Sequence, residues 1–449
     1  MDLSDNSGKS LPNQMRFSDT TPLGIHSRSR KVKFFSQNAG TFTNLNNTVR
    51  IPITSSSSFL DPQFTALSFT LTNTSGQDFQ ADGSWNSFIQ RIRLTSASGG
   101  DLEDIRNYGY LVNVLSDLQY STAQRYTKTM EGYGYAGLLT PTIAVQAGGA
   151  AVVAQAAFIG ANENSFGTGE PAVTNAAQVT VFLPIMSSLI GTSARKYLPL
   201  FLIGPLTLEI EFASGYSPYV TLNATTGYQV TNICLHTQLI EFDADVNISL
   251  TQMANKNGLV IHGTTWSSYY NSLPNSDNPN IVISERLESV KSLLTCFSIN
   301  PADSTTRYMA RHPAYVRSLQ FKIGSELYPA QPIQGSSEVV FSNSEYMYEA
   351  LKAIGEYGNS LHQSIISSVN YAATGVTINS VGRCVFGVDL DAFSKSPIES
   401  GLSTVLNNPI TMQFTTAKGA NTMPGSNFTF LLHDITYHLS SQGQFTAHK

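Results

Sequence analysis

The clearest pattern in the chain is an alternation of apolar and polar residues that occurs twice. From Leu206 to Phe212 every second residue is apolar, and Thr or Glu fills the positions between. The segment from Ile410 to Thr415 alternates in the same way. A period of two is typical of a β-strand with one buried and one solvated face. Both segments are therefore predicted to be strands.

These strands belong to a longer internal repeat. Pro205 precedes the first segment, and Pro409 precedes the second 204 positions later. A second landmark, Val-Phe at 181–182, returns at 385–386 with the same spacing of 204. Residues 88–94 and 316–323 also alternate, so strands are expected early in each copy as well.

A short amphipathic helix is expected after the early strands of each copy, because apolar residues recur there at helical spacing. These residues are Ile105, Tyr108, Val112 and Leu115 in the first copy, and Met347, Ala350, Leu351 and Ile354 in the second. Runs of short strands separated by turns with Gly and Pro favour β-sandwiches. The chain is therefore predicted to be all-β, with two tandem sandwiches, short helices and long loops.

The repeat also sets the expected boundaries. A long Gly- and Ala-rich loop is expected at about 132–177 within the first unit, since so long a stretch is unusual for a simple connection. The predicted parts are an N-terminal arm at 1–33, a first sandwich at 34–243, a linker at 244–257, a second sandwich at 258–443 and a C-terminal tail at 444–449.

The amino-acid composition limits the classes of function that the chain can have. Of the 449 residues only 13% are charged, about half the share that is usual in soluble domains. Such a surface suits a protein whose sides lie against neighbours. The net charge of −5 argues against binding nucleic acid over the whole surface. Cys234, Cys296 and Cys384 lie in apolar, strand-like runs and are predicted to be buried free thiols, which agrees with synthesis inside a cell. The acidic start of the chain predicts no secretion signal.

The sequence offers no catalytic constellation. The motifs HExxH, CxxC and GxSxG do not occur. The strongest metal candidate is His433, Asp434 and His438, but the two histidines have opposite parity in a strand and point to opposite faces. Asp243 and Asp245 are interpreted as polar residues at a strand end. No catalytic, cofactor-binding or metal-binding residue is predicted, and the chain is not expected to be an enzyme.

Several segments resemble the major capsid proteins of the adenovirus-like and giant-virus-like DNA viruses, a lineage that includes polinton-like viruses and virophages. The segments that carry the resemblance are Arg50–Ile53, Trp85–Ile92, Tyr197–Leu200 with Gly204–Ile210, Glu288–Leu293 and Leu432–Asp434. The resemblance covers residues 34–443 and implies that each sandwich is a jelly roll.

The resemblance also implies a function. Proteins of this family form homotrimers, and these pseudo-hexagonal capsomers tile an icosahedral shell around DNA. The expected partners are neighbouring capsomers and penton and minor capsid proteins, and the expected location is the virion, after synthesis and assembly in the host cell. No cofactor is implied. Two alternatives stay open: a capsid protein with a single jelly roll and a protruding β domain, and a two-sandwich protein that binds or cleaves glycans.

One basic cluster lies in the expected arm, at Arg28, Arg30, Lys31 and Lys33. In a shell protein these residues are predicted to form an assembly arm on the inner face, in contact with an inner membrane, DNA or a neighbouring capsomer. A solvated tail is the other interpretation.

Overall fold

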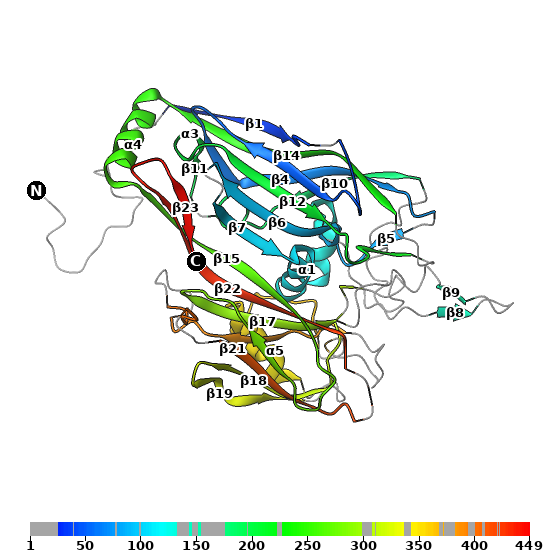
Figure 1. Cartoon of the computed structure of the whole chain (residues 1–449). Coiled ribbons are helices and arrows are strands. Elements are labelled where there is room, and N and C mark those ends of the chain that lie inside the picture. Colours follow the sequence, from blue (N-terminus) through cyan, green and yellow to red (C-terminus); the bar gives the residue numbers. More distant parts are fainter. Residues whose placement is uncertain are drawn as a thin grey trace, which may run out of the picture.

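The chain folds into two β-sandwiches joined by one helix (Figure 1). The structure is a computed structural model. It describes residues 26–449 except 39, 77–78, 98–99, 133–142, 146–150, 154–175, 195, 222–226, 299–307, 310, 336–342, 368–370, 372–381, 394–399, 406–408, 420 and 422. The predicted all-β fold is confirmed.

Two antiparallel sheets form the first sandwich. One has the main order β1-β14-β4-β10, to which the short strands β2 (Thr41–Thr43) and β11 (Leu198–Pro199) also pair, and the other has the order β3-β12-β6-β7. The bounds are β1 Ser27–Phe35, β3 Thr48–Ile53, β4 Phe59–Asn73, β6 Ile89–Ser96, β7 Asp101–Arg106, β10 Gln178–Pro184, β12 Leu206–Phe212 and β14 Tyr228–Phe242. Numbered along the chain from one to eight, these strands run 1-8-3-6 and 2-7-4-5, which is the jelly-roll order.

The second sandwich repeats this order strand for strand. Its sheets are β15-β22-β17-β20 and β16-β21-β18-β19. The bounds are β15 Leu259–Ser272, β16 Asn280–Ile283, β17 Val290–Ser298, β18 Val316–Ile323, β19 Glu326–Gln334, β20 Phe386–Asp389, β21 Ile410–Thr416 and β22 Ser426–Leu439. The tandem jelly roll is therefore present, and a single jelly roll with an unrelated β domain is wrong.

Short elements complete the two units. The helices are α1 Tyr108–Gln119, α2 Thr122–Thr127, α3 Leu200–Ile203, α4 Ala244–Asn257, α5 Ser344–Ala353 and the 3-10 turns η3 Trp85–Phe88 and η4 Lys128–Glu131. The minor strands are β2 Thr41–Thr43, β5 Phe79–Ala81, β8 Ile143–Val145, β9 Ala151–Val153, β11 Leu198–Pro199, β13 Tyr219–Thr221 and β23 Phe445–His448. Among the described helices, none has the length and apolarity needed to cross a membrane.

The sequence repeat matches the structure at one landmark and not at the other. Strands β12 and β21 begin 204 residues apart, and both bury every second residue as predicted. At the other landmark Phe182 lies on the outer face of β10 and is 40% exposed, whereas Phe386 lies on the inner face of β20 and is buried. The spacing of 204 therefore matches a residue on the outer face of β10 with one on the inner face of β20, and the predicted equivalence of Phe182 and Phe386 was wrong.

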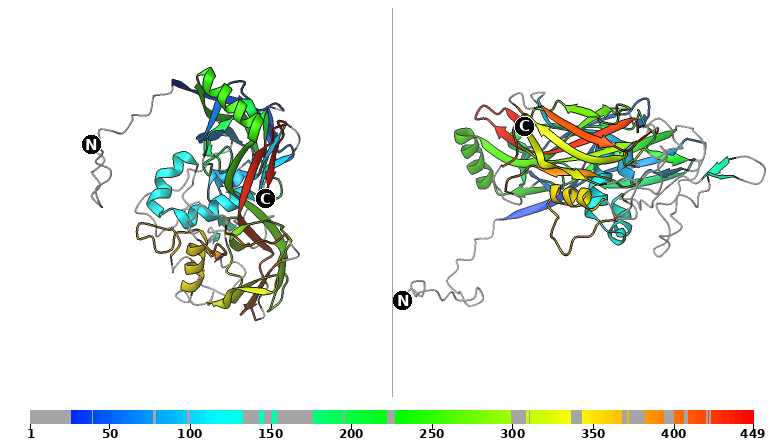
Figure 2. Two further views of the ribbon diagram at one scale, coloured as in Figure 1. Left: turned by 90° about the vertical axis from the view of Figure 1, so that its left-hand side faces the viewer. Right: turned by 90° about the horizontal axis from the view of Figure 1, so that it is seen from below.

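The predicted helices are present, with one shift. Tyr108, Val112 and Leu115 lie in α1, but Ile105 is a buried residue of the preceding strand β7. The residues of the expected linker form α4. In Figure 2 (left), α1 and α5 lie on the same side of the two sandwiches.

Both chain ends of the predicted layout need correction. Residues 27–33 were assigned to a flexible arm, but they form most of β1, which pairs with β14 from Ser27↔Phe242 to Phe35↔Cys234. Val32 and Phe34 pack against the core. The expected tail at 444–449 contains β23, which pairs with β22. Most of the predicted loop at 132–177 and residues 1–25 lie outside the described residues; within the loop, β8 and β9 pair antiparallel.

The strand β1 gives a test by truncation. Deleting residues 1–35 should lower the free energy of unfolding by about 2 kcal/mol or more, because Val32 and Phe34 leave the core and the edge of β14 loses its partner. Deleting residues 1–26, which spares the strand, should change it little. Urea unfolding of the two truncated proteins measures the difference. Equal midpoints would contradict the assignment of β1 to the fold.

Candidate functional site

The two sandwiches meet in a buried junction, and one charged cluster lies at its centre. Asp117, in α1 of the first sandwich, forms ion pairs with Arg125 of α2 and with two arginines of the second sandwich. Its carboxylate oxygens are 2.6 Å from Arg311 Nη2 and 2.8 Å from Arg383 Nη1. The backbone carbonyl of Asp117 also accepts a hydrogen bond from Ser364. One carboxylate thus holds parts of both units.

These four charges are shielded from solvent. Asp117, Arg125, Arg311 and Arg383 are all buried. Burial by itself would raise the pKa of Asp117, but Arg383, Arg311 and Arg125 together outweigh it and hold the pKa well below its usual range. Asp117 is therefore ionised at neutral pH. A buried ionised group of this kind needs its partners in place, so the junction cannot open without a large cost.

A second buried carboxylate reinforces the junction nearby. Glu103, on β7, accepts hydrogen bonds from the backbone N–H of Ser188 at 3.0 Å and from the hydroxyls of Ser187 and Ser188. It also accepts a hydrogen bond from Thr265, which belongs to β15 of the second sandwich. Ser188 in turn contacts the hydroxyl of Tyr437 on β22. The oxygens of Glu103 are thus satisfied from both units.

Aromatic stacking fills the rest of the junction. Tyr110 of α1 stacks on Phe428 of β22 with ring centroids 4.4 Å apart. Tyr216 stacks on Tyr308, whose ring belongs to the second sandwich, at 4.0 Å. Such pairs add to the energy of apolar burial. The two jelly rolls therefore form one rigid body.

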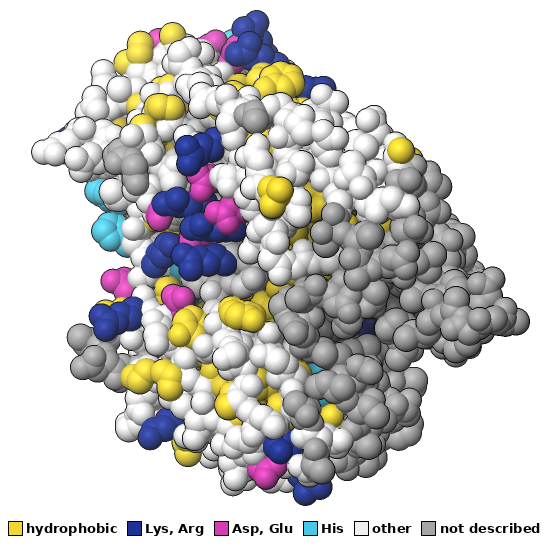
Figure 3. Space-filling model, turned by 45° about the vertical axis from the view of Figure 1, so that its right-hand side comes forward, with side chains coloured by type: hydrophobic (Ala, Val, Ile, Leu, Met, Phe, Trp, Pro, Cys, Tyr) yellow, Lys and Arg dark blue, Asp and Glu magenta, His cyan; other side chains and the backbone are white. Residues whose placement is uncertain are grey.

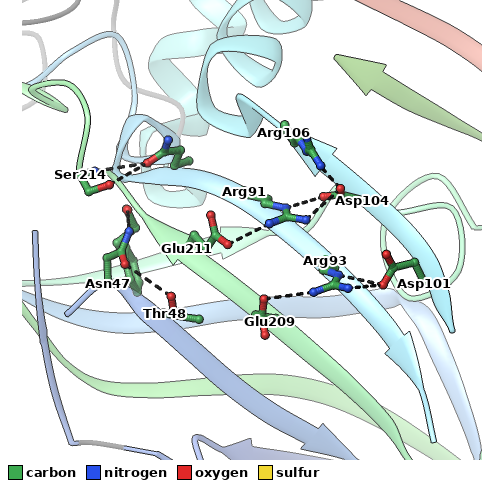
Figure 4. A network of polar contacts seen from close by, with 12 residues as sticks. Asn47, Thr48, Arg91, Arg93, Asp101, Asp104, Arg106, Glu209, Glu211 and Ser214 are labelled. Carbon is green, nitrogen blue, oxygen red and sulfur yellow. Dashed lines mark hydrogen bonds and ion pairs between the residues drawn. The ribbon is translucent and has the colours of Figure 1, made fainter. Parts of the chain in front are cut away.

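The solvent-facing side of β3-β12-β6-β7 carries a network of paired charges. Arg91 is bound by Asp104 and Glu211, and Arg93 by Asp101 and Glu209, all on the same face of the sheet (Figure 4). Arg50 and Arg106 extend the network at its two edges. Figure 3 shows basic and acidic side chains gathered on a surface that is otherwise largely uncharged.

The corresponding sheet of the second sandwich lacks this network. Glu209 pairs in register with Arg93 and Arg50, whereas Gln413, at the repeated position of β21, pairs with Gln320 and Asn280. Further along the strand Ser318 and Thr415 hydrogen bond at 2.7 Å. The two units thus share one fold but present chemically different outer faces.

The predicted basic cluster divides between the two faces of β1. Arg28 and Arg30 both form ion pairs with Glu241 on β14. Lys31 and Lys33 are exposed on the opposite face, which is also the face of His236. Burial, followed by these two lysines, lowers the pKa of His236. The four residues are part of a sheet edge, so their predicted location in an arm outside the first sandwich was wrong; their role in assembly stays a prediction.

The remaining candidates lie apart from one another. His433 is buried, and its Nδ1 and Nε2 bond to the Asp434 carbonyl and the Ser267 hydroxyl. Asp243 occupies the N-cap position of α4, without a side-chain capping hydrogen bond, and Asp245 lies in the first turn, so they do not share a strand. Within the described residues no group of His, Cys, Asp and Glu could hold a metal ion. The three cysteines are buried and free, as predicted.

The sequence interpretation missed the junction residues Asp117 and Glu103. One signal was available for Asp117, because it is the single acidic residue in the apolar stretch from Tyr108 to Leu118. An ionised residue on an otherwise buried helix needs a buried partner. Its partners at Arg311 and Arg383 are so distant in sequence that no local pattern indicates them.

Comparisons with known proteins give the fold of the whole chain. No protein-family model matches it, and no curated protein matches it in sequence. Solved structures do match it in fold. VP54 of the virus PBCV-1, fitted into a reconstruction of the virophage Sputnik, has a TM-score of 0.58 at 11% identity, over 96% of this chain and 98% of that one.

Two further structures agree. A chain of the Sputnik virophage structure has a TM-score of 0.58 at 12% identity, over 98% of this chain and 93% of that one. The Faustovirus major capsid protein has a TM-score of 0.57 at 7% identity, over 94% and 92%. These likenesses extend over both sandwiches. The chain has the double-jelly-roll fold of these viral proteins.

The junction gives a stability prediction. Asp117→Asn should lower the free energy of unfolding by about 3–5 kcal/mol, because it leaves buried arginines without their counter-charge. As a matched control, Glu209→Gln in the outer network should cost less than about 1 kcal/mol, since surface ion pairs contribute little. Denaturant unfolding measures both. Similar losses for the two variants would show that the junction is not held by Asp117.

A second prediction concerns pH. Burial lowers the pKa of His433 from 6.5 to about 4. The unfolded chain therefore binds a proton at this residue below about pH 6.5 while the folded chain does not. As the pH falls from 7.5 to 5, protonation of this residue in the unfolded chain should lower the free energy of unfolding by about 2 kcal/mol. The effect should level off near pH 4. The difference in pH slope between the wild type and His433→Asn isolates the contribution. An unchanged slope in the variant would contradict it.

Proposed function

We propose that the chain is a major capsid protein that assembles as homotrimers, forming pseudo-hexagonal capsomers of an icosahedral shell around a DNA genome. The observation that carries the proposal is the match of both jelly rolls, over nearly the whole chain, to VP54 of PBCV-1 and to the Faustovirus major capsid protein. The function is structural, without a catalytic role. Its place is the virion, after synthesis and assembly in the host cell.

The architecture of the chain supports this role. Two jelly rolls with the same strand order, fixed to each other by the junction, make a chain with two similar building units. Three such chains supply six similar units, so a particle with threefold symmetry can occupy a position with six neighbours in a lattice. A rigid junction is needed for this, because a hinge would let the orientation of the two units vary, and the six units would then not hold regular hexagonal positions.

The proposed partners follow from the same geometry. They are two further copies of the chain within the capsomer, then neighbouring capsomers and penton and minor capsid proteins. Contact with an inner membrane or with DNA through the N-terminal residues before β1 is part of the proposal. The low share of charged residues supports extensive lateral contact, because charged groups are depleted in the cores of interfaces.

Negative-stain electron microscopy of the purified chain tests the proposal. The expected result is hexagonal plates with a threefold centre, together with closed shells or curved sheets at high protein concentration. Discrete particles of the size of one chain, under every condition of salt and concentration, would contradict it. A glycan-binding or glycan-cleaving protein would give that second result.

A further inference from the structure

We infer that Phe35 on β1 docks beside Tyr348 and Leu351 of α5 in a second copy of the chain, and so joins neighbouring chains of the capsomer. The inference rests on the proposed function and names the contact by which the copies meet. It is drawn from the junction within the chain, where helix α1 of the first sandwich covers an aromatic residue of the second. Because the fold repeats, helix α5 and Phe35 are the corresponding helix and aromatic residue, and they can meet only between two copies.

Within the chain, helix α1 of the first sandwich covers Trp266 of the second. Val112 and Leu115 of α1 line one pocket together with Trp266 on β15 and Leu432 on β22. Trp266 and Leu432 pair in register and share the outer face of their sheet. Trp266 is only 8% exposed, and Tyr110 of α1 stacks on Phe428 of the same sheet, so α1 lies over this face. This is an aromatic residue on the first strand of a jelly roll, buried by the helix of the preceding one.

Phe35 is the counterpart of Trp266 in the first sandwich. Leu432 is the seventh residue of β22, and Cys234 is the seventh residue of β14, the matching strand. Leu432 pairs with Trp266, and Cys234 pairs with Phe35. Both aromatic residues lie on the outer face of the first strand of their unit. Phe35, however, is 65% exposed, and no described helix covers it.

Helix α5 is the counterpart of α1, since each helix follows the fifth main strand of its unit. Val112 and Leu115 are the fifth and eighth residues of α1, and Tyr348 and Leu351 are the fifth and eighth of α5. In α1 these positions are buried against the second sandwich. In α5 Tyr348 is 39% exposed, so within the described part of the chain no helix covers the equivalent surface in the way that the second sandwich covers α1.

The surface of α5 is shaped to receive a side chain. Tyr348 and Leu351 line a groove of about 310 Å³ with Met347, Tyr357 and Ile366. Tyr357 is 55% exposed and meets Tyr348 edge to face, with ring centroids 4.3 Å apart. An exposed aromatic groove and an exposed phenylalanine are the two halves of a typical interface anchor.

Charge favours the same pairing. Lys31 and Lys33 lie on the same face of β1 as Phe35 and are exposed. The first turn of α5 carries the exposed acid Glu345, and Glu356 follows the helix, while Lys352 in the last turn forms an ion pair with Glu349. Lys31 and Lys33 opposite Glu345 and Glu356 steer the two copies together and disfavour β1 against β1. The contact is head to tail, so it closes as a ring when the rotation between copies allows it.

The test uses single substitutions at exposed positions, so that folding is preserved. Phe35→Ser and Tyr348→Ser should each raise the concentration at which half of the chains are in trimers by at least about tenfold. Val282→Ser is the matched control, because Val282 is 51% exposed but lies on the other sheet of the second sandwich. It should leave assembly unchanged. Sedimentation measures assembly, and thermal melting at low concentration confirms that each variant is folded.

A charge pair distinguishes a direct contact from an indirect effect. Phe35→Glu and Tyr348→Lys should each prevent trimer formation, and the double variant should restore it, because each interface then contains one acid opposite one base. Normal trimers of Phe35→Ser, or no rescue in the double variant, would overturn this inference and leave the proposed capsomer intact. A wild-type chain that never associates would overturn both.

Discussion

The buried interaction of Asp117 with three arginines is the constraint on which the molecule depends. Two of these arginines, Arg311 and Arg383, come from the second sandwich, so the carboxylate keeps its counter-charges only when both units are in place. Breaking a buried charge pair costs far more than breaking a surface pair. Glu103 and the stacked aromatic rings add contacts over the same boundary. The chain is therefore one rigid unit and not two sandwiches on a linker.

Because the two sandwiches are fixed to each other, the differences between their outer faces have fixed positions on the molecule. Their inner faces are built alike, with every second residue of β12 and β21 buried. Their outer faces are not, since Glu209 and its arginines correspond to Gln413 and neutral amides. Because the two units have the same shape but different surface chemistry, a neighbouring copy can bind the first sandwich and the second sandwich differently. A head-to-tail ring needs that distinction, whereas a chain with two identical faces would pair in several ways.

The sequence predicted the fold well where the evidence was local. The alternation in β12 and β21 follows from burial of one strand face, and each strand carries that signal by itself. Strand β1 was misplaced because its charged residues resemble a tail; the partner of Arg28 and Arg30 is Glu241, more than 200 residues away. Asp117 was missed for the same reason. Long-range pairing of charges leaves no period in the sequence, so only the folded chain reveals the junction.

In the proposed capsomer each chain supplies two of the six similar units of a threefold particle. Light scattering of the purified, full-length chain under mild, low-salt conditions tests it most directly. A chain of 48.7 kDa should give a particle with three times that mass. A stable particle with the mass of a single chain, at every concentration at which the protein stays in solution, would contradict it.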